Sequence, residues 1–295
     1  MADYYTQSMR ALRLAGKGER TQECYTRAVR QLVQFYAKQP AEISEPELED
    51  YFLHRQNVTG WSGATLRIAQ AGIKFFFVNV LKRDWHLFAY LNAKRERRLP
   101  CILSREEVFA VLDHVSAAPY HAFFSTVYAC GLRLSEALAL EVSDIDSKRM
   151  MIHVHLGKGA IDRFVPLPDN TLHLLRKHWC THRNPRLLFP ALGRDVTAAA
   201  TTENSMPMRR VQETFQDARK TAGITKRRVT IHTLRHCYAT HLLEAGVNPH
   251  VIQRYMGHRR LETTMAYFHL TQKGSEDAYR LIDSMMKGFD HGRDQ

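Results

Sequence analysis

The sequence predicts a mainly α-helical protein of two domains, with a small β-hairpin in the second domain, so the fold class is α+β. Three observations lead to this prediction. Apolar residues recur at helical spacing through most of the 295 residues. One short segment changes to strict alternation, which is typical of a strand. A basic stretch without an apolar period, KRERRLPCILS, separates two helical regions. We therefore place the domains at residues 1–93 and 104–295 and a linker at 94–103.

The first domain is expected to be a bundle of about four helices. YTRAVRQLVQFYAKQ carries an apolar stripe from Val29 to Tyr36, and ISEPELEDYFLHRQ begins with Ser44 as its N-cap and Pro46 in its first turn. After the turn NVTGWSG, the segment ATLRIAQAGIKFFFVNVLK carries a second stripe, formed by Leu66, Ala69, Ile73, Phe76 and Val80.

The second domain is expected to begin with a capping box, Ser104 with Glu107. The segment YHAFFSTVYACGLRLSEALAL is typical of a helix that breaks at Gly131 and restarts. In MMIHVHLGKGAIDRFVPLP, apolar residues alternate with histidines, GKGA makes a turn, and DRFVPL returns as a second strand. Helices resume at NTLHLLRKHWC and MRRVQETFQDARKTAG, and a loop is predicted at 191–207.

Charge narrows the classes of partner. The formal net charge is +12, the pI is about 9.6, and the basic excess is shared equally between residues 1–100 and the remainder. Positive charge spread along both domains suits a long polyanion such as nucleic acid, although many soluble proteins are mildly basic without such a partner.

The cysteines and the apolar runs argue against a secreted or membrane protein. The five cysteines are scattered and form no C-x-x-C pair, which argues against a disulfide framework or a zinc knuckle and fits a reducing cytosol. The N-terminus is polar, and no apolar run approaches the roughly 20 residues that a membrane span needs. We expect a cytoplasmic protein with no membrane partner.

The stretch TIHTLRHCYATHLLEAG presents either a metal site or a phosphate site. His232 and His236 lie four residues apart, as in helical zinc pairs, but Thr233 stands where the metalloprotease pattern needs Glu. No carboxylate is placed nearby as a third ligand. Arg235 shares the helical face of His232, and its positive charge would repel a metal ion. We therefore expect no metal and favour phosphate, which matches the fork of donors on an arginine.

A second arginine upstream strengthens the phosphate interpretation. In ACGLRLSEALAL, Arg133 precedes Glu136 by one helical turn, which could hold the guanidinium in place or be an ordinary surface pair. Arg133 and Arg235 together could clamp both non-bridging oxygens of one phosphodiester without a metal. Lys158, at the hairpin tip, could reach a leaving oxygen, and Tyr267 could be a nucleophile. The alternatives are a solvated lysine and a core tyrosine.

An ordered set of motifs runs through residues 104–272. The motifs are G-L-R-x-S-E-x-L at 131–138, G-K-G at 157–159 with R-x-V-P-L at 163–167, H-T-L-R-H-x-x-A-T at 232–240, I-Q-x-x-M-G-H at 252–258 and T-T-x-x-Y at 263–267. Their order and spacing are specific where each motif alone is not. The set resembles the tyrosine recombinase family, which includes phage-type integrases and Xer-type resolvases. Met256 stands where the family more often has Leu, a conservative change.

The resemblance implies a fold and a set of residue roles. The fold is a two-domain, C-shaped DNA clamp whose N-terminal helices are similar to the family's core-binding domain. Tyr267 would attack a backbone phosphate and form a 3′-phosphotyrosyl link. The implied supporting roles are phosphate binding by Arg133 and Arg235, protonation of the 5′-oxygen by Lys158, proton transfer with Tyr267 by His232, a hydrogen bond to phosphate from His258 and support from Glu136. His236 and His241 are expected to be structural.

The resemblance also implies partners. The covalent link conserves the energy of the phosphodiester, so no ATP, metal or other cofactor is expected. Two rounds of strand exchange on double-stranded DNA with paired recombination sites pass through a Holliday junction and need a homotetramer, which would be a monomer or weak oligomer when free of DNA. Arg67 and Lys74 are expected DNA contacts. The resemblance leaves room for accessory proteins and places the protein in the bacterial nucleoid.

The C-terminal tail and the biological role remain open at this point. The segment SEDAYRLIDSMMKGF is an amphipathic helix that either docks on a neighbouring protomer or packs on its own domain. A type IB topoisomerase would use similar chemistry, and a DNA-binding regulator could be built on an inactive copy of the fold. The small N-terminal bundle argues against the first, and the complete set of site residues argues against the second. Integration, excision, cassette capture, transposition and dimer resolution are not distinguished.

Overall fold

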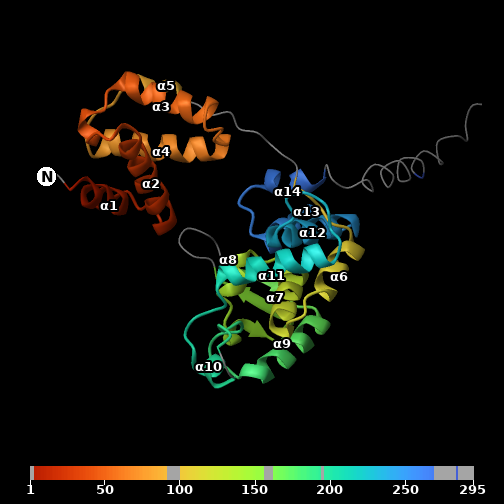
Figure 1. Ribbon diagram of the computed structural model, residues 1–295. Coiled ribbons are helices and arrows are strands. Elements are labelled where there is room, and N and C mark those ends of the chain that lie inside the picture. Colours follow the sequence, from red (N-terminus) through yellow and green to blue (C-terminus); the bar gives the residue numbers. More distant parts are fainter. Residues whose placement is uncertain (1–2, 92–99, 156–161, 194–195, 269–283, 285–295) are drawn as a thin grey trace, which may run out of the picture. The chain divides into compact units, whose positions relative to one another are not determined.

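The computed structural model describes residues 3–91, 100–155, 162–193, 196–268 and 284. The chain divides into two compact units, residues 1–98 and 99–295, and the division falls inside the basic segment 94–103. Both units are largely helical, and one small sheet lies in the second unit, so the predicted fold class is confirmed (Figure 1). No helix in the described ranges is long and apolar enough to cross a membrane.

The N-terminal unit is built around two long helices, α2 and α4, that pack along each other. Gly72 allows this close approach, because a Cβ at its position would lie 2.8 Å from the Cα of Tyr25. Ser44 and Glu47 form the capping box that starts α3. The helices of this unit are α1 (Tyr4–Leu14), α2 (Glu19–Tyr36), a 3-10 turn η1 (Pro40–Glu42), α3 (Glu45–Asn57), α4 (Gly63–Asn79) and the short α5 (Leu87–Tyr90).

The C-terminal unit is arranged around α7, which packs against α6, α9 and α12. Phe123, Phe124 and Val127 on α7 are fully buried in its apolar core. The elements in order are α6 (Arg105–Asp113), α7 (Ala118–Cys130), α8 (Leu134–Leu138), η2 (Val142–Asp144), β1 (Ile145–Asp146), β2 (Met151–Val154), β3 (Arg163–Pro166), α9 (Asp169–His182), α10 (Val196–Thr201), α11 (Met208–Thr221), α12 (Ile231–Glu244), α13 (Pro249–Met256) and α14 (Leu261–Phe268).

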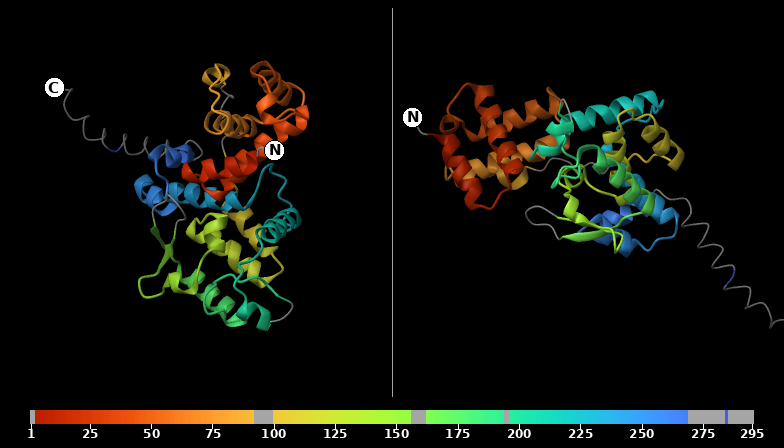
Figure 2. Two further views of the ribbon diagram at one scale, coloured as in Figure 1. Left: turned by 90° about the vertical axis from the view of Figure 1, so that its left-hand side faces the viewer. Right: turned by 90° about the horizontal axis from the view of Figure 1, so that it is seen from below.

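The sheet contains the predicted hairpin and one further strand. The strand order is β1-β2-β3, all antiparallel, and β2 pairs with β3 in the register Ile152 to Val165. In Figure 2 the strands lie beside the helices at the C-terminal end of the described chain, and α13 packs on β3. Strand β1 was not predicted, because two residues are too short to show a period.

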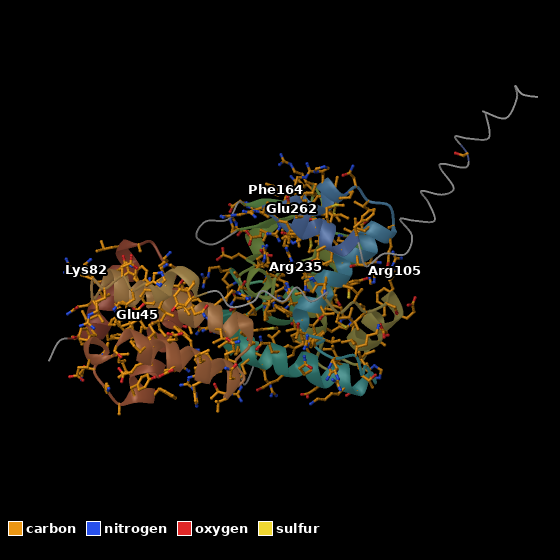
Figure 3. All side chains as sticks on the ribbon, turned by 90° about the horizontal axis from the view of Figure 1, so that it is seen from above. Glu45, Lys82, Arg105, Phe164, Arg235 and Glu262 are labelled. Carbon is orange, nitrogen blue, oxygen red and sulfur yellow. The ribbon has the colours of Figure 1, made fainter. Side chains whose placement is uncertain are left out.

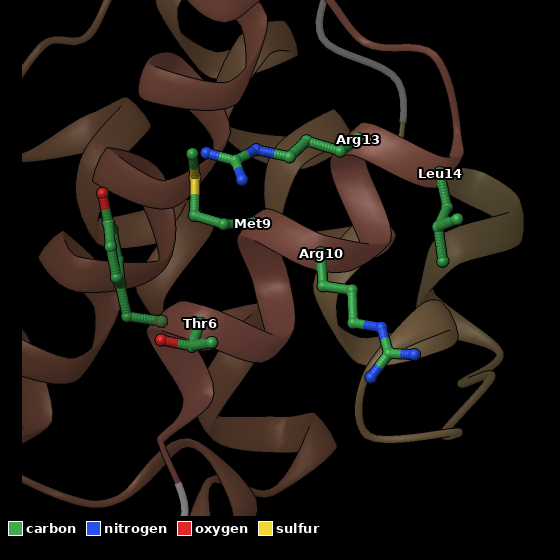
Figure 4. Close-up of a pocket in the computed structure, with 6 residues that line it drawn as sticks. Thr6, Met9, Arg10, Arg13 and Leu14 are labelled. Atoms are coloured by element: carbon green, nitrogen blue, oxygen red, sulfur yellow. The ribbon is translucent and has the colours of Figure 1, made fainter.

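The predicted loop at 191–207 contains helix α10, so that prediction was wrong over Val196–Thr201. The segment includes three consecutive alanines, 198–200, and alanine has the highest helix propensity of all residues. All five cysteines are free. A surface hollow lies along one face of α1 (Figure 4), lined by Tyr5, Thr6, Met9, Arg10, Arg13 and Leu14.

Candidate active site

The centre of the C-terminal unit holds a buried arginine. Helix α12 places Arg235 in the interior, where it is 1% exposed; it lies inside the unit in Figure 3, where Phe164 is a half-exposed side chain of the sheet. Its guanidinium donates to the backbone carbonyls of Gly131 and Met256. Burial lowers the pKa of Arg235 to about 9, with a further contribution from the charge of Arg133, so the side chain remains protonated at neutral pH.

Gly131 makes this arrangement sterically feasible. It ends α7 in the left-handed conformation with φ of 61°, and a Cβ there would lie 2.3 Å from the ring of Tyr238. A glycine is therefore needed both for the turn and for the close approach of the Tyr238 ring. The turn directs the carbonyl of Gly131 at Arg235 and leads directly into α8, which carries the next site residues.

Glu136 lies between the arginines and joins them. Its carboxylate accepts from Arg133 Nη1 at 2.5 Å and from Arg163 Nη1 and Nη2 at 3.0 and 2.7 Å, and it lies 3.8 Å from Arg235. Burial opposes ionisation, but the hydrogen bonds and charge of Arg163, with further bonds from Arg133, bring the pKa of Glu136 down to about 2. Glu136 is therefore a buried carboxylate that fixes guanidinium groups, rather than a partner in a surface pair.

Arg163 is a site residue that the sequence analysis did not single out. It is 6% exposed, pairs with Glu136 through two hydrogen bonds and donates from Nε to the carbonyl of Tyr255 at 2.7 Å. The signal was present in the strand alternation, because Arg163 and Val165 point inward whereas Phe164 points outward. An arginine at an inward strand position requires a buried partner.

Arg133 is the more accessible member of this cluster. Its side chain is 36% exposed, and Nη2 donates to the carbonyl of Gly257 at 3.3 Å. The structure thus brings together Arg133, Arg235 and Glu136, as predicted, and adds Arg163. Three guanidinium groups face one carboxylate, so the cluster carries net positive charge, which is the environment that a phosphate requires.

Tyr267 lies close to this cluster on helix α14, which packs on α12. Its ring is 5% exposed, and its hydroxyl forms a 2.7 Å hydrogen bond with Nδ1 of His236. Burial raises the pKa of Tyr267, while Arg235 and Arg133 act in the opposite direction. His258 stacks on the Tyr267 ring with centroids 6.2 Å apart, and its Nδ1 is 2.9 Å from the hydroxyl of Thr264.

The histidines of α12 are arranged differently from the expectation. His236, expected to be structural, is the histidine bonded to Tyr267. His232, expected to act with Tyr267, is exposed and packs edge-on against His236 at 4.4 Å between ring centroids. Helical geometry explains the difference, because His232 lies one turn earlier and closer to the start of the helix. His241 bonds to the hydroxyl of Tyr128 and the carbonyl of Leu103, which fits its expected structural role.

Other predicted residues lie elsewhere or outside the described residues. Lys158 lies in 156–161, outside the described residues. The predicted C-terminal helix, apart from Ser284, lies in 269–283 and 285–295, which are also outside them. Arg67 and Lys74 lie on α4 in the N-terminal unit, and Lys74 Nζ donates to the carbonyl of Phe88 at 3.1 Å.

One group of side chains on the sheet has the composition of a metal site. Asp144, His153 and His155 offer ligand atoms within 4.8 Å of one another, and His155 Nε2 is 2.8 Å from Asp144 Oδ1. This group lies beside the end of β2 that leads toward β3, and not on α12, where the sequence offered the possible zinc pair His232 and His236. Its His155–Asp144 bond also makes it an ordinary hydrogen-bonded pair, and we assign it no role in the chemistry.

Comparisons with known proteins identify the family. The model of the phage integrase family matches residues 102–273, and that of the N-terminal SAM-like domain of phage integrases matches residues 4–87. The chain belongs to the phage integrase family. It is a tyrosine-type site-specific DNA recombinase, an enzyme that cleaves and rejoins DNA strands through a 3′-phosphotyrosyl intermediate and a Holliday junction.

Individual relatives of the recombinase are similar over most of their length. The Sinorhizobium fredii protein y4qK is 36% identical over 253 residues, which cover 85% of this chain and 79% of that protein. An integrase/recombinase of Escherichia coli is 30% identical over 301 residues, which cover 90% of this chain and 89% of that protein. Among solved structures, a lambda integrase dimer bound to a COC′ core site shares the fold with a TM-score of 0.71 at 15% identity, covering 90% of this chain and 94% of that one.

Proposed function

We propose that Tyr267 is the nucleophile of this recombinase and that the buried arginine cluster is its phosphate clamp. The observation that carries the proposal is the convergence of α8, β3, α12 and α14 on one place. There, the Tyr267 ring lies within electrostatic reach of Arg133 and Arg235. The attacking oxygen would join phosphorus as the bond to the 5′-oxygen breaks, which leaves a 3′-phosphotyrosyl link.

The clamp is suited to the transition state of that step. A pentavalent phosphorus gathers negative charge on its non-bridging oxygens, and donors fixed in advance stabilise this charge without reorganising. Arg235 is held by two backbone carbonyls and Arg133 by Glu136, so both forks keep their positions before DNA binds. Glu136 and Arg163 therefore act as supports, and Arg133, with its greater exposure, would meet the phosphate first.

Two further groups complete the proposed chemistry. His258 is neutral, because burial and the nearby arginine charges lower its pKa to about 3. If its Nδ1 accepts from Thr264, the ring proton lies on Nε2, which is then a donor for a phosphate oxygen. Lys158 would protonate the departing 5′-oxygen. Its place in the sequence, between β2 and the buried Arg163 of β3, supports this role.

The assembly that we propose follows from the reaction. Exchange of both strands on paired recombination sites in double-stranded DNA requires four active protomers, hence a homotetramer on DNA that is monomeric or weakly associated when free. Arg67 and Lys74 on α4 of the N-terminal unit would contact DNA. The segment 275–295 would dock on a neighbouring protomer, with accessory proteins as further partners. The site of action would be the bacterial nucleoid.

A covalent-trapping experiment tests the nucleophile. The protein is incubated in EDTA with nicked duplexes cut from the DNA that flanks its own gene, and the products are separated on denaturing gels beside Tyr267→Phe. We expect a DNA-linked protein band that is lost in the variant. A band that survives the substitution would show that another residue attacks the phosphate. Relaxation of supercoiled DNA without specific sites would indicate a topoisomerase instead.

A truncation tests the proposed role of the tail. Removal of residues 275–295 should abolish the pairing of two DNA sites while leaving the binding of one site intact. The two properties are separated by band-shift assays with one and two sites. Recombination by the truncated protein at the rate of the full chain would contradict the proposal.

A further inference from the structure

We propose that His236, rather than His232, is the base that receives the phenolic proton of Tyr267 when the tyrosine attacks DNA. This inference rests on the proposed role of Tyr267 as the nucleophile. Its foundation is the 2.7 Å contact between His236 Nδ1 and the Tyr267 hydroxyl, which is within the range of a direct proton transfer. The His232 ring lies beside His236 and is exposed to solvent.

The fold holds the two groups together independently of DNA. His236 follows Arg235 directly on α12, and Tyr267 lies on α14, which packs along α12. Tyr267 is confined on a second side by the ring of His258. One helix therefore supplies a phosphate ligand and the partner of the nucleophile from adjacent residues. The phenol would reach the phosphate with its hydrogen-bond partner still in contact.

The proposed step balances in atoms and charge. The O–H bond of Tyr267 breaks, its proton moves to Nδ1 of His236, and the phenolate oxygen forms the new bond to phosphorus. The bond from phosphorus to the 5′-oxygen breaks, and that oxygen takes a proton from Lys158. In rejoining, the 5′-hydroxyl gives its proton to the neutral amine of Lys158, and its oxygen forms the new bond to phosphorus. The bond between Tyr267 and phosphorus breaks, and the imidazolium of His236 returns its proton to the phenolate. No outside oxidant, reductant or co-reactant is needed.

Electrostatics would make this transfer depend on DNA. Without DNA, burial and the charges of His232 and Arg235 lower the pKa of His236 to about 4, so its ring is neutral and available as an acceptor. Burial also keeps the phenol of Tyr267 protonated. A bound phosphate would offset the arginine charge and so favour an imidazolium at His236. The nucleophile would thus be activated only when a phosphodiester occupies the clamp.

The test compares His236→Asn with His232→Gln on nicked duplexes and measures the single-turnover rate of covalent adduct formation. Asparagine places an oxygen near the position of Nδ1 but takes no proton at neutral pH. We expect the rate to fall by at least about 100-fold in His236→Asn, in line with the loss of a general base. The decrease for His232→Gln should be much smaller. His250→Asn, at an exposed position on α13, is the matched control and should keep the wild-type rate.

A second substrate distinguishes protonation of the leaving oxygen from deprotonation of Tyr267. When sulfur replaces the bridging 5′-oxygen, the leaving group needs no proton. This substrate should restore cleavage by Lys158→Ala but not by His236→Asn, because the missing base acts on the nucleophile. The rate of His236→Asn should also rise with pH, about tenfold per unit, since solvent must then deprotonate Tyr267. DNA binding and thermal melting of the variant, compared with wild type, verify that it is folded.

The outcomes are distinct for the two proposals. If His236→Asn cleaves within about threefold of wild type, or if His232→Gln alone is slow, the inference about His236 is overturned while Tyr267 can remain the nucleophile. If Tyr267→Phe still forms the adduct, the proposed function fails before the base is considered. Recovery of His236→Asn on the sulfur substrate would assign His236 to the leaving group and would also overturn the inference.

Discussion

The two units of this recombinase bury different kinds of side chain. The N-terminal unit has an apolar and aromatic interior with Ile73 and Phe77 fully buried, and Arg55 covers its edge by stacking on the rings of Phe35, Tyr51 and Trp61. The C-terminal unit has a larger apolar core but also buries Glu136, Arg163 and Arg235, at 7%, 6% and 1% exposure.

This difference indicates what each interior is for. Apolar burial stabilises a fold directly, whereas a buried ion cluster must recover the cost of removing its charges from water and often contributes little to stability. The interior of the first unit therefore serves the stability of the fold. The second retains a costly charged centre, which is understandable if the charges act on a phosphate. The following experiments test this contrast, beginning with the largest expected effect.

Arg235→Ala should have the largest effect, and the loss should appear in the rate of DNA cleavage rather than in DNA binding. Loss of one fixed donor of this kind costs about 100- to 1,000-fold in rate, and Arg235 presents a fork of two. We expect covalent adduct formation to fall at least 1,000-fold, with DNA binding changed far less, because many other cations contribute to binding. Arg235→Lys keeps the charge but lacks the fork, so it should recover only part of the rate. Single-turnover cleavage and band shifts measure the two quantities. Equal losses in binding and cleavage would contradict a transition-state role.

Phe77→Ala tests the apolar interior of the N-terminal unit. The ring is fully buried on α4 and lies 4.5 Å, between centroids, from the ring of Trp85. A substitution of this kind costs about 3–5 kcal/mol through lost burial and the cavity left behind. We expect the N-terminal unit to melt at a lower temperature, with little change in a second transition from the C-terminal unit. Calorimetry would reveal both transitions. A shift of both together would show that the units unfold as one.

The sequence predicted the parts of the structure that local patterns control. The alternation around Ile152 identified the hairpin, and Ser104 with Glu107 forms the capping box at the start of α6, as expected. Motif spacing identified Arg133, Glu136 and Arg235, which the described structure brings together. The bond between His236 and Tyr267 was missed because it joins residues 31 positions apart through the packing of two helices, which no local period encodes. Arg163 was missed although its inward strand position was predictable.

Glu136→Gln tests the charged centre directly. The substitution removes the negative charge that faces three arginines while nearly preserving shape. Breaking a buried pair in this way is destabilising by about 3–5 kcal/mol, because the remaining charges lie unpaired in the interior. We expect the transition of the C-terminal unit, but not that of the N-terminal unit, to shift in calorimetry. Unchanged melting would mean that water or backbone groups replace the carboxylate fully.

The same carboxylate predicts an acid sensitivity confined to the C-terminal unit. The pKa of Glu136 is lowered from 4.5 to about 2 by its arginine partners acting against burial. A lowered pKa in the folded state contributes stability that is complete above pH 4.5 and is lost as the pH falls toward 2. Wild type should therefore lose stability across this window, and Glu136→Gln should lose less of it. Parallel acid denaturation curves for the two proteins would contradict the assignment.

The smallest effect is expected for an ion pair of similar length at the surface. Lys226 Nζ lies 2.6 Å from Glu107 Oε2, about as close as Arg163 is to Glu136, but the two side chains are 44% and 28% exposed. Solvent screens such a pair, and exposed pairs contribute about 0.2–1 kcal/mol. Lys226→Gln removes the charge and leaves Glu107 in its capping box. Its destabilisation, measured by urea denaturation, should be several times smaller than that of Glu136→Gln and should shrink further in 1 M salt. Equal effects would mean that distance rather than burial sets the strength of these pairs, and the contrast between the two interiors would lose its physical basis.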